Sequence, residues 1–132
     1  TGVQVKLNPI REAVEGKRVI MIDDSIVRGT TSDRIVSMLK EAGAKEVHVR
    51  ISSPPFLYPC YFGTDVPDSD QLIAYNRTIE EIRQIIGADS LGYLKLERLP
   101  ELTGGRQFCQ GCFTGKWPID PPKEDIRGEY DA

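Results

Sequence analysis

The sequence is poor in the features that mark membrane, secreted and nucleic-acid-binding proteins. No apolar run approaches the roughly 20 residues that a bilayer-spanning helix needs, and no signal peptide is present. Only three of the 132 residues are cysteine. An odd number without a secretion signal argues against a disulfide framework and for thiols or thiolate ligands in a reducing cytoplasm. The chain has 17 Lys and Arg and 20 Asp and Glu, which gives a net charge of −3. Neither nucleic acid nor an anionic membrane is therefore an expected partner.

The composition is that of an ordinary soluble globular protein, with 39% hydrophobic and 28% charged residues. The length fits one domain or part of a larger one, and about two thirds of the unfolded surface could be buried. The chain begins at Thr1 rather than at Met, and we interpret it as an excised fragment or a processed chain. We expect it in the cytoplasm.

The first hydrophobic pattern predicts a strand followed by a helix. The apolar run "VIMI" at residues 19–22 is typical of a strand buried on both faces. A helix should begin near Thr30 or Thr31, because Thr30 and Asp33 have the spacing of a capping box, with Asp in place of Glu or Gln. Gly43 should end this helix at its C′ position. The apolar stripe of the helix consists of Ile35, Met38, Leu39 and Ala42.

A second strand and a second helix follow. Residues 46–52 alternate and are β-branched, which predicts a strand, and the resulting β–α–β unit implies a parallel sheet. Three prolines predict an irregular loop over residues 53–72. A helix is expected over about 77–86 and a short strand over 91–96, before a Gly- and Pro-rich tail that starts at Gly104. The inward residues of this helix should be Ile79, Ile82, Ile85 and Ile86.

The turn after the first strand has the chemistry of a phosphate site. It lies at the carboxyl end of a parallel strand and at the amino end of a helix, where open α/β sheets bind ligands. The unpaired N–H groups of the first helical turn favour an anion. Ser25, Thr30 and Thr31 could add hydroxyl donors, and Arg28 could add a cation. Gly29 permits a tight turn and close approach of the anion.

Two carboxylates, Asp23 and Asp24, precede this turn and would repel a phosphate placed beside them. Carboxylates only accept hydrogen bonds, so the pair is suited to vicinal hydroxyls or to Mg²⁺. A sugar 5-phosphate would satisfy both the acid pair and the turn. The plainer alternative is that the acid pair merely ends a strand and that residues 25–31 form a capped turn.

The segment "VIMIDDSIVRGTTS" resembles the motif with which type I phosphoribosyltransferases bind phosphoribosyl pyrophosphate (PRPP). In particular it is similar to glutamine PRPP amidotransferases, or amidophosphoribosyltransferases, and the likeness extends from about Lys6 to Pro118. Further similar segments are "LKEAGAKEVHVRISSPP", "CYFGTDVP", "LIAYNRTIEEIRQIIGADSLGYL" and "FCQGCFTGKWP". The resemblance implies an α/β chain with part of the type I phosphoribosyltransferase fold. That fold has a mainly parallel sheet with flanking helices and an irregular Cys-bearing C-terminal region. We expect a PRPP-binding domain at residues 1–103 and a Cys-containing segment at residues 104–132.

The resemblance also implies an activity. The chain would be a C-terminal fragment of a glycosyltransferase that makes 5-phosphoribosylamine from PRPP and glutamine-derived ammonia, the first step of de novo purine synthesis. Asp23 and Asp24 would bind the ribose hydroxyls and Mg²⁺, residues 25–31 would hold the 5-phosphate, and Lys6 would meet the pyrophosphate. A missing N-terminal domain would use glutamine, purine nucleotides would regulate the enzyme, and it would form homo-oligomers. The fragment alone should be inactive, because the strands and loop on the pyrophosphate side of the family's site precede it.

The cysteines allow two interpretations. Cys109 and Cys112 have the C-x₂-C spacing that lets two thiolates reach one metal centre, and Cys60 lies in the predicted loop. Taken alone, these residues could equally be three buried or free thiols. The resemblance points to a subgroup that holds a 4Fe–4S cluster with four cysteines, three of which match Cys60, Cys109 and Cys112. The fourth would lie upstream of Thr1, and zinc is the competing ligand in a fragment.

Two other functions stay open at this stage. One is another type I phosphoribosyltransferase, such as an enzyme that acts on a nucleobase, although the Cys-bearing segments match the amidotransferases and not the base enzymes. The other is a non-catalytic regulator that binds PRPP or a nucleotide. A glutaminase cysteine upstream of the chain would decide for the amidotransferase. The single histidine, His48, is expected to be structural.

Overall fold

The chain folds around a three-stranded parallel sheet. The computed structural model describes residues 11–63, 66 and 68–121. The strands are β1 (Arg18–Asp23), β2 (Glu46–Ile51) and β3 (Ser90–Tyr93), and they lie side by side in the order β1-β2-β3. Both strand pairs are parallel, as the predicted crossover requires. The last strand is shorter than the 91–96 segment that the sequence predicts.

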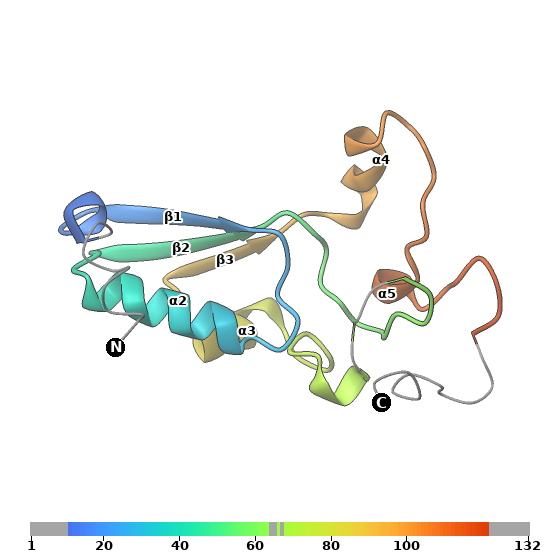
Figure 1. Cartoon of the computed structure of the whole chain (residues 1–132), viewed down its shortest axis with the longest axis horizontal. Coiled ribbons are helices and arrows are strands. Elements are labelled where there is room, and N and C mark those ends of the chain that lie inside the picture. The colour runs from blue at the N-terminus through green and yellow to red at the C-terminus, as the bar shows by residue number, and fades with distance from the viewer. Residues whose placement is uncertain (1–10, 64–65, 67, 122–132) are drawn as a thin grey trace.

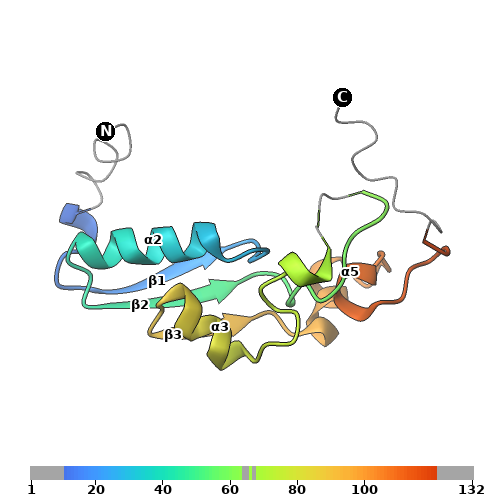
Figure 2. The same ribbon diagram turned by 90° about the horizontal axis from the view of Figure 1, so that it is seen from below.

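Helices α2 (Thr30–Glu41) and α3 (Ile79–Ile86) connect the strands and cover the same face of the sheet (Figures 1 and 2). The core lies between the helices and this face. Its buried residues are Ile26, Val36, Val47, Val49, Ile51, Ile73, Ala74, Ile82, Ile86 and Ala88. The α/β fold class predicted from the sequence is therefore confirmed.

The opposite face of the sheet carries two exposed isoleucines on β1. Ile20 is 67% exposed and Ile22 is 76% exposed, so the prediction that this strand is buried on both faces is wrong. The physical reason is that α2 and α3 both lie on the other face, and no described element covers this one. On β2 and β3 the same face is polar. There, the ring nitrogens of His48 lie 2.8 Å from the Ser90 hydroxyl and 2.8 Å from a Glu46 carboxylate oxygen.

The sequence predicts the C-terminal end of α2 correctly, but not the cap at its N-terminal end. Thr30 is the first helical residue rather than the cap, and Gly29 precedes it with φ 85° and without a side-chain cap. The predicted capping box at Thr30 is therefore wrong, because the hydroxyl lies one position too far into the helix. At the other end Gly43, with φ 96°, follows the helix and donates its N–H to the Lys40 carbonyl at 2.9 Å, as predicted.

Helix α3 carries the capping box that the sequence pattern placed elsewhere. The Thr78 hydroxyl accepts the Glu81 N–H at 3.2 Å, and the Glu81 carboxylate accepts the Thr78 N–H at 2.7 Å. The Thr78 N–H and the Thr78 hydroxyl, which donates to the same carboxylate at 3.0 Å, lower the pKa of Glu81. The capping box fixes the point at which the chain enters this helix.

Only half of the isoleucines predicted to face inward on α3 do so. Ile82 and Ile86, one turn apart, are fully buried, whereas Ile79 and Ile85 are about half exposed. Ile85 lies one position from Ile86 and therefore points about 100° away from the buried stripe. Ile79 lies in the first turn and lines an apolar groove with Tyr93, at the end of β3.

The region that bears the cysteines lies beyond the carboxyl ends of the strands (Figure 1). It contains the short helices η2 (Leu96–Arg98), α4 (Leu99–Leu102) and α5 (Gly111–Thr114), and the predicted loop before it contains η1 (Ser69–Gln71). The region is otherwise irregular, in agreement with the sequence. A domain boundary after residue 103 stays a prediction. In the part of the chain that the structure describes, no helix has both the length and the apolar character needed to span a bilayer.

Candidate functional site

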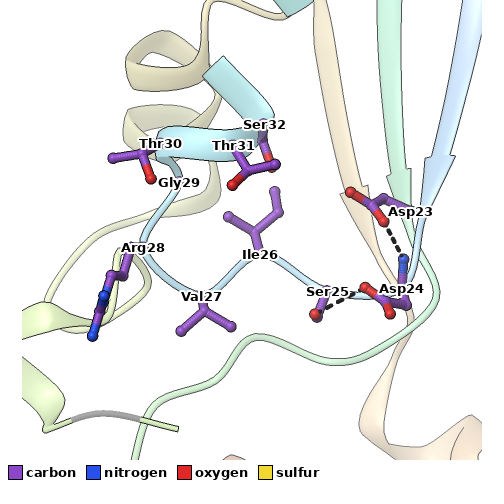
Figure 3. A pocket seen from close by; sticks show the side chains of 10 residues that line it. All are labelled: Asp23, Asp24, Ser25, Ile26, Val27, Arg28, Gly29, Thr30, Thr31 and Ser32. Atoms are coloured by element: carbon purple, nitrogen blue, oxygen red, sulfur yellow. Dashed lines mark hydrogen bonds between the residues drawn. The ribbon is translucent and has the colours of Figure 1, made fainter. Parts of the chain in front are cut away.

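A cavity of about 460 Å³ lies where β1 ends and α2 begins. One uninterrupted segment, residues 23–32, lines it (Figure 3). The acid pair lies at one end of this segment, and Thr30 and Thr31 lie at the other. The structure thus brings the acid pair and the hydroxyl-rich turn to one concave surface. We call this segment the cavity loop.

The amino end of α2 faces the cavity with unused backbone donors. The first helical bond runs from the Asp33 N–H to the Gly29 carbonyl at 2.9 Å, so the N–H groups of residues 30–32 have no acceptor within the helix. Gly29 supplies no side-chain cap. The helix dipole adds partial positive charge at this end of a 12-residue helix. These groups can bind an anion such as a phosphate.

The hydroxyls of the cavity loop are not equivalent. The side chains of Thr30 and Thr31 are exposed at the start of α2. The Ser25 hydroxyl instead donates to an Asp24 carboxylate oxygen at 3.0 Å. Ser32 also lines the cavity but is only 3% exposed. Ser32 is not among the site residues that the sequence predicts, although its position in the first turn of the predicted helix was a signal for it.

The acid pair is held by the backbone around it. Asp23 is half-buried and accepts the Asp24 N–H at 2.9 Å, and its own carbonyl accepts the Ser52 N–H at 3.0 Å. Asp24 is exposed. Two carboxylates side by side offer acceptors to a diol or hard oxygen ligands to a cation.

The remaining predicted residues of this site lie apart from the acid pair or outside the described residues. Arg28 is exposed, and its guanidinium points away from Asp23 and Asp24 (Figure 3). Within the cavity loop it therefore lies apart from the acid pair, beside Gly29. Lys6 lies outside the described residues.

The donor set suits Mg²⁺ better than a metal that needs a complete protein cage. Within the described ranges, no group of three or more His, Cys, Asp or Glu side chains could hold one metal ion. Mg²⁺ is commonly bound by only one or two carboxylates, with water and substrate phosphates completing its shell. Asp23 and Asp24 fit that pattern.

The three cysteines are brought close together by contacts far apart in the sequence. The N–H groups of Leu57 and Tyr58 donate to the Cys112 carbonyl at 2.9 and 3.0 Å, which ties the loop that contains Cys60 to α5. Burial, followed by the nearby sulfurs of Cys60 and Cys109, raises the pKa of the Cys112 thiol to about 11. The sulfurs of Cys60 and Cys109 therefore both lie near that of Cys112.

Aromatic rings surround this cysteine group. The ring of Trp117 lies 5.2 Å from that of Tyr61 and 6.2 Å from that of Tyr58, on either side of Cys60 in the chain. A Cβ atom at Gly111 would lie 2.1 Å from the Trp117 ring, so the indole packs directly on the backbone beside Cys112. These rings pack beside Cys60 and Cys112, which are half-buried, whereas Cys109 is exposed.

Comparisons with known proteins give a consistent result. The chain is 52% identical over 128 residues to amidophosphoribosyltransferase 2, chloroplastic, of Arabidopsis thaliana, covering 96% of this chain and 23% of that protein. It is 56% identical over 127 residues to the amidophosphoribosyltransferase of Bacillus subtilis, covering 90% of this chain and 26% of that protein. The corresponding enzyme of Archaeoglobus fulgidus is 54% identical over 129 residues, with 95% and 28% covered. The chain is a homologue of one segment of amidophosphoribosyltransferases.

A solved structure agrees with these relatives. The glutamine PRPP amidotransferase of Bacillus subtilis, complexed with ADP and GMP, superposes with a TM-score of 0.79 at 52% identity, over 89% of this chain and 27% of that one. The chain therefore shares the fold of a part of that amidotransferase. It spans about a quarter of the length of the curated relatives that it matches. No protein-family model matches it.

Proposed function

We propose that this chain is the PRPP-binding part of an amidophosphoribosyltransferase that makes 5-phosphoribosylamine in the first step of purine synthesis. The observation that carries the proposal is the cavity of residues 23–32, where an acid pair and an open helix amino terminus lie on one surface. The homology to amidophosphoribosyltransferases of plants, archaea and bacteria supports it and does not favour a base-specific enzyme or a regulator.

In this proposal the two ends of the cavity loop hold the two ends of PRPP. The amides of residues 30–32 and the hydroxyls of Thr30 and Thr31 bind the 5-phosphate. Arg28 adds a cation there, and Ser25 is released from Asp24 to join these donors. Asp23 and Asp24 accept the ribose hydroxyls and would hold Mg²⁺, whose charge would neutralise the pyrophosphate oxygens. Lys6, which lies outside the described residues, would meet the pyrophosphate.

The chemistry needs positioning and charge more than a protein nucleophile. The bond from C1 to pyrophosphate breaks, the pyrophosphate leaves with its electron pair, and the nitrogen of ammonia forms the new bond to C1. The ring carries positive charge as the bond breaks. The acid pair next to the ribose is placed to stabilise that charge, while the amides fix the far end of the substrate.

The other partners belong to the parent protein. We propose that a separate domain of the parent releases ammonia from glutamine, that purine nucleotides regulate it, and that it is a cytoplasmic homo-oligomer. ADP and GMP in the complex of the Bacillus subtilis enzyme support nucleotide regulation.

We further propose that Cys60, Cys109 and Cys112 supply three of the four ligands of a 4Fe–4S cluster in the parent. Each cysteine binds a different iron of such a cluster, so the thiolates need not converge on one point, and a group that could not hold a single ion still fits. The cluster would tie the loop of Cys60 to α5 and would have a structural role.

The parent protein gives the direct test of the proposed function. With PRPP and Mg²⁺ it should release pyrophosphate when glutamine or ammonia is added, and not when a nucleobase is added. Pyrophosphate release with a nucleobase alone would favour the base-specific enzyme. PRPP binding without release in any mixture would favour the regulator.

The 132-residue chain alone should form no phosphoribosylamine, because it spans only about a quarter of its relatives. The measurement is pyrophosphate release from PRPP with ammonia, beside the parent protein at equal concentration. Turnover by the chain alone would show that the missing part is not needed for chemistry.

The exposed isoleucines of β1 lead to a stability prediction. In the parent we expect another segment to cover Ile20 and Ile22, since the exposure of two large apolar side chains on one open sheet face to water is unfavourable. Ile22→Lys should then destabilise the parent by roughly 2–4 kcal/mol in denaturant unfolding. Ser37→Lys, on the exposed side of α2, is the control and should change stability little. Equal stability of both variants would mean that the face stays open.

A further inference from the structure

A turn far along the chain packs beneath the cavity loop. Leu72, Ile73 and Ala74 are 1–4% exposed, although they belong to no helix or strand. The N–H of Ile73 donates to the Val27 carbonyl at 2.8 Å. We call residues 72–77 the supporting turn. The burial of Leu72, Ile73 and Ala74 and this bond connect the cavity loop to the core, which Ile26 of the loop also enters.

The bond from Ile73 sets the orientation of one peptide group in the cavity loop. The Val27 carbonyl and the Arg28 N–H belong to the same planar trans peptide, in which the C=O and N–H groups point in opposite directions. Because the carbonyl points to Ile73, the Arg28 N–H points away from the supporting turn. Arg28 is part of the cavity lining. The bond from Ile73 thus directs the Arg28 N–H away from the supporting turn. It also keeps the Val27 carbonyl, which would repel an anion, pointing toward the supporting turn.

The side chain of Ile73 fixes the next residue of the loop by packing. A Cβ atom at Gly29 would lie 2.4 Å from the Cδ1 atom of Ile73. The backbone at Gly29 also has φ 85°, a conformation that residues with a side chain rarely adopt. The Ile73 side chain therefore fills the space beside the residue from which α2, with its open N–H groups, begins.

The supporting turn is itself anchored to α3. The Arg77 guanidinium donates to the Ile73 carbonyl at 3.2 Å. The next residue, Thr78, is the cap of α3 and is fixed by the capping box with Glu81. Both backbone polar groups of Ile73 are thus bonded, one to the cavity loop and one to Arg77, the residue before the cap of α3.

We propose that Ile73 is a positioning residue for the 5-phosphate end of PRPP, acting through Val27 and Gly29 without touching the substrate. The proposal rests on the function proposed above. Loss of its side chain would leave the loop free to shift, and shifts near 1 Å in a binding loop can change rates by about 10²-fold. Because the 5-phosphate is bound equally in the ground and transition states, the effect should fall mainly on KM for PRPP.

The test compares two buried isoleucines in the parent protein. Ile73→Ala should raise KM and Kd for PRPP about tenfold with a smaller change in kcat, as expected when uniform binding is lost. Ile86→Ala is the matched control, because Ile86 is 0% exposed, lies in the same core cluster and does not line the cavity. It should lower Tm as much as Ile73→Ala while KM and Kd for PRPP stay at the wild-type value.

A milder variant covers the case in which Ile73→Ala does not fold. Ile73→Val removes the Cδ1 atom that packs beside Gly29 and keeps a β-branched residue, so it should raise KM for PRPP by about threefold at nearly unchanged Tm. Wild-type Kd for PRPP in a folded Ile73→Ala protein, or an equal rise in Ile86→Ala, would overturn the positioning role. A wild-type parent that does not bind PRPP would overturn the proposed function, and the positioning role with it.

Discussion

Replacing Asp23 and Asp24 together by asparagine should abolish turnover of the parent enzyme while leaving its stability nearly unchanged. We expect kcat to fall by roughly 10³-fold or more, since even one oriented electrostatic group is commonly worth about 10²–10³ in kcat. Asparagine keeps the shape and one acceptor oxygen, so the bonds from the Asp24 N–H and the Ser25 hydroxyl can persist. What is lost is the negative charge that faces the ribose and Mg²⁺.

The double substitution separates the functional interpretation of the acid pair from the structural one. Activity is measured as PRPP-dependent pyrophosphate release and stability by denaturant unfolding. Asp33→Asn is the matched control, because it removes a charge from the first turn of α2 but does not line the cavity. We expect the control to keep most of its activity. Severe unfolding of the double variant would favour an acid pair that merely ends a strand.

Cys112→Ser should remove iron and sulfide from the parent protein. A 4Fe–4S cluster is usually held by four cysteine thiolates, and a serine hydroxyl is a much poorer ligand because it is far less acidic than a thiol. Burial and the sulfurs of Cys60 and Cys109 raise the pKa of the Cys112 thiol to about 11, so without metal this group stays protonated and metal binding must release its proton. We therefore expect cluster assembly to weaken as the pH falls.

Iron, acid-labile sulfide and zinc are measured on anaerobically purified protein. Phe108→Leu is the control, because Phe108 is an exposed neighbour of Cys109 and carries no sulfur. This variant should keep its iron. Zinc without sulfide in the wild-type parent would contradict the cluster and identify a zinc site. Absence of all three from the wild-type protein would favour the interpretation as simple thiols.

The sequence predicts the β–α–β–α–β order well because local signals carry it. Alternation in β2 and the stop at Gly43 both depend on neighbours in the chain. The stripe of α2 was predicted less well, because Val36, which was not among its predicted residues, is fully buried, whereas Ile35 and Met38 are only half-buried. The bare face of β1 was missed for the opposite reason. A run of four apolar residues indicates two apolar faces but does not say whether this chain or another part of the protein covers them.

The candidate site likewise has one part that the sequence predicts and another part that depends on the tertiary fold. The cavity loop is one contiguous segment, so its acid pair, hydroxyls and Gly29 were visible in the sequence. Ile73 was not, because it reaches the loop only through the tertiary fold, and an isoleucine in "LIAYN" carries no chemical signal of its own. The approach of Cys60 to Cys112 likewise depends on backbone bonds between distant segments.

The most direct test of the central claim is a crystal structure of the parent protein with PRPP bound. We predict 5-phosphate oxygens at about 2.7–3.2 Å from the amide nitrogens of residues 30–32, with the ribose hydroxyls against Asp23 and Asp24. A 5-phosphate bound elsewhere, with these amides facing water or protein, would contradict the account.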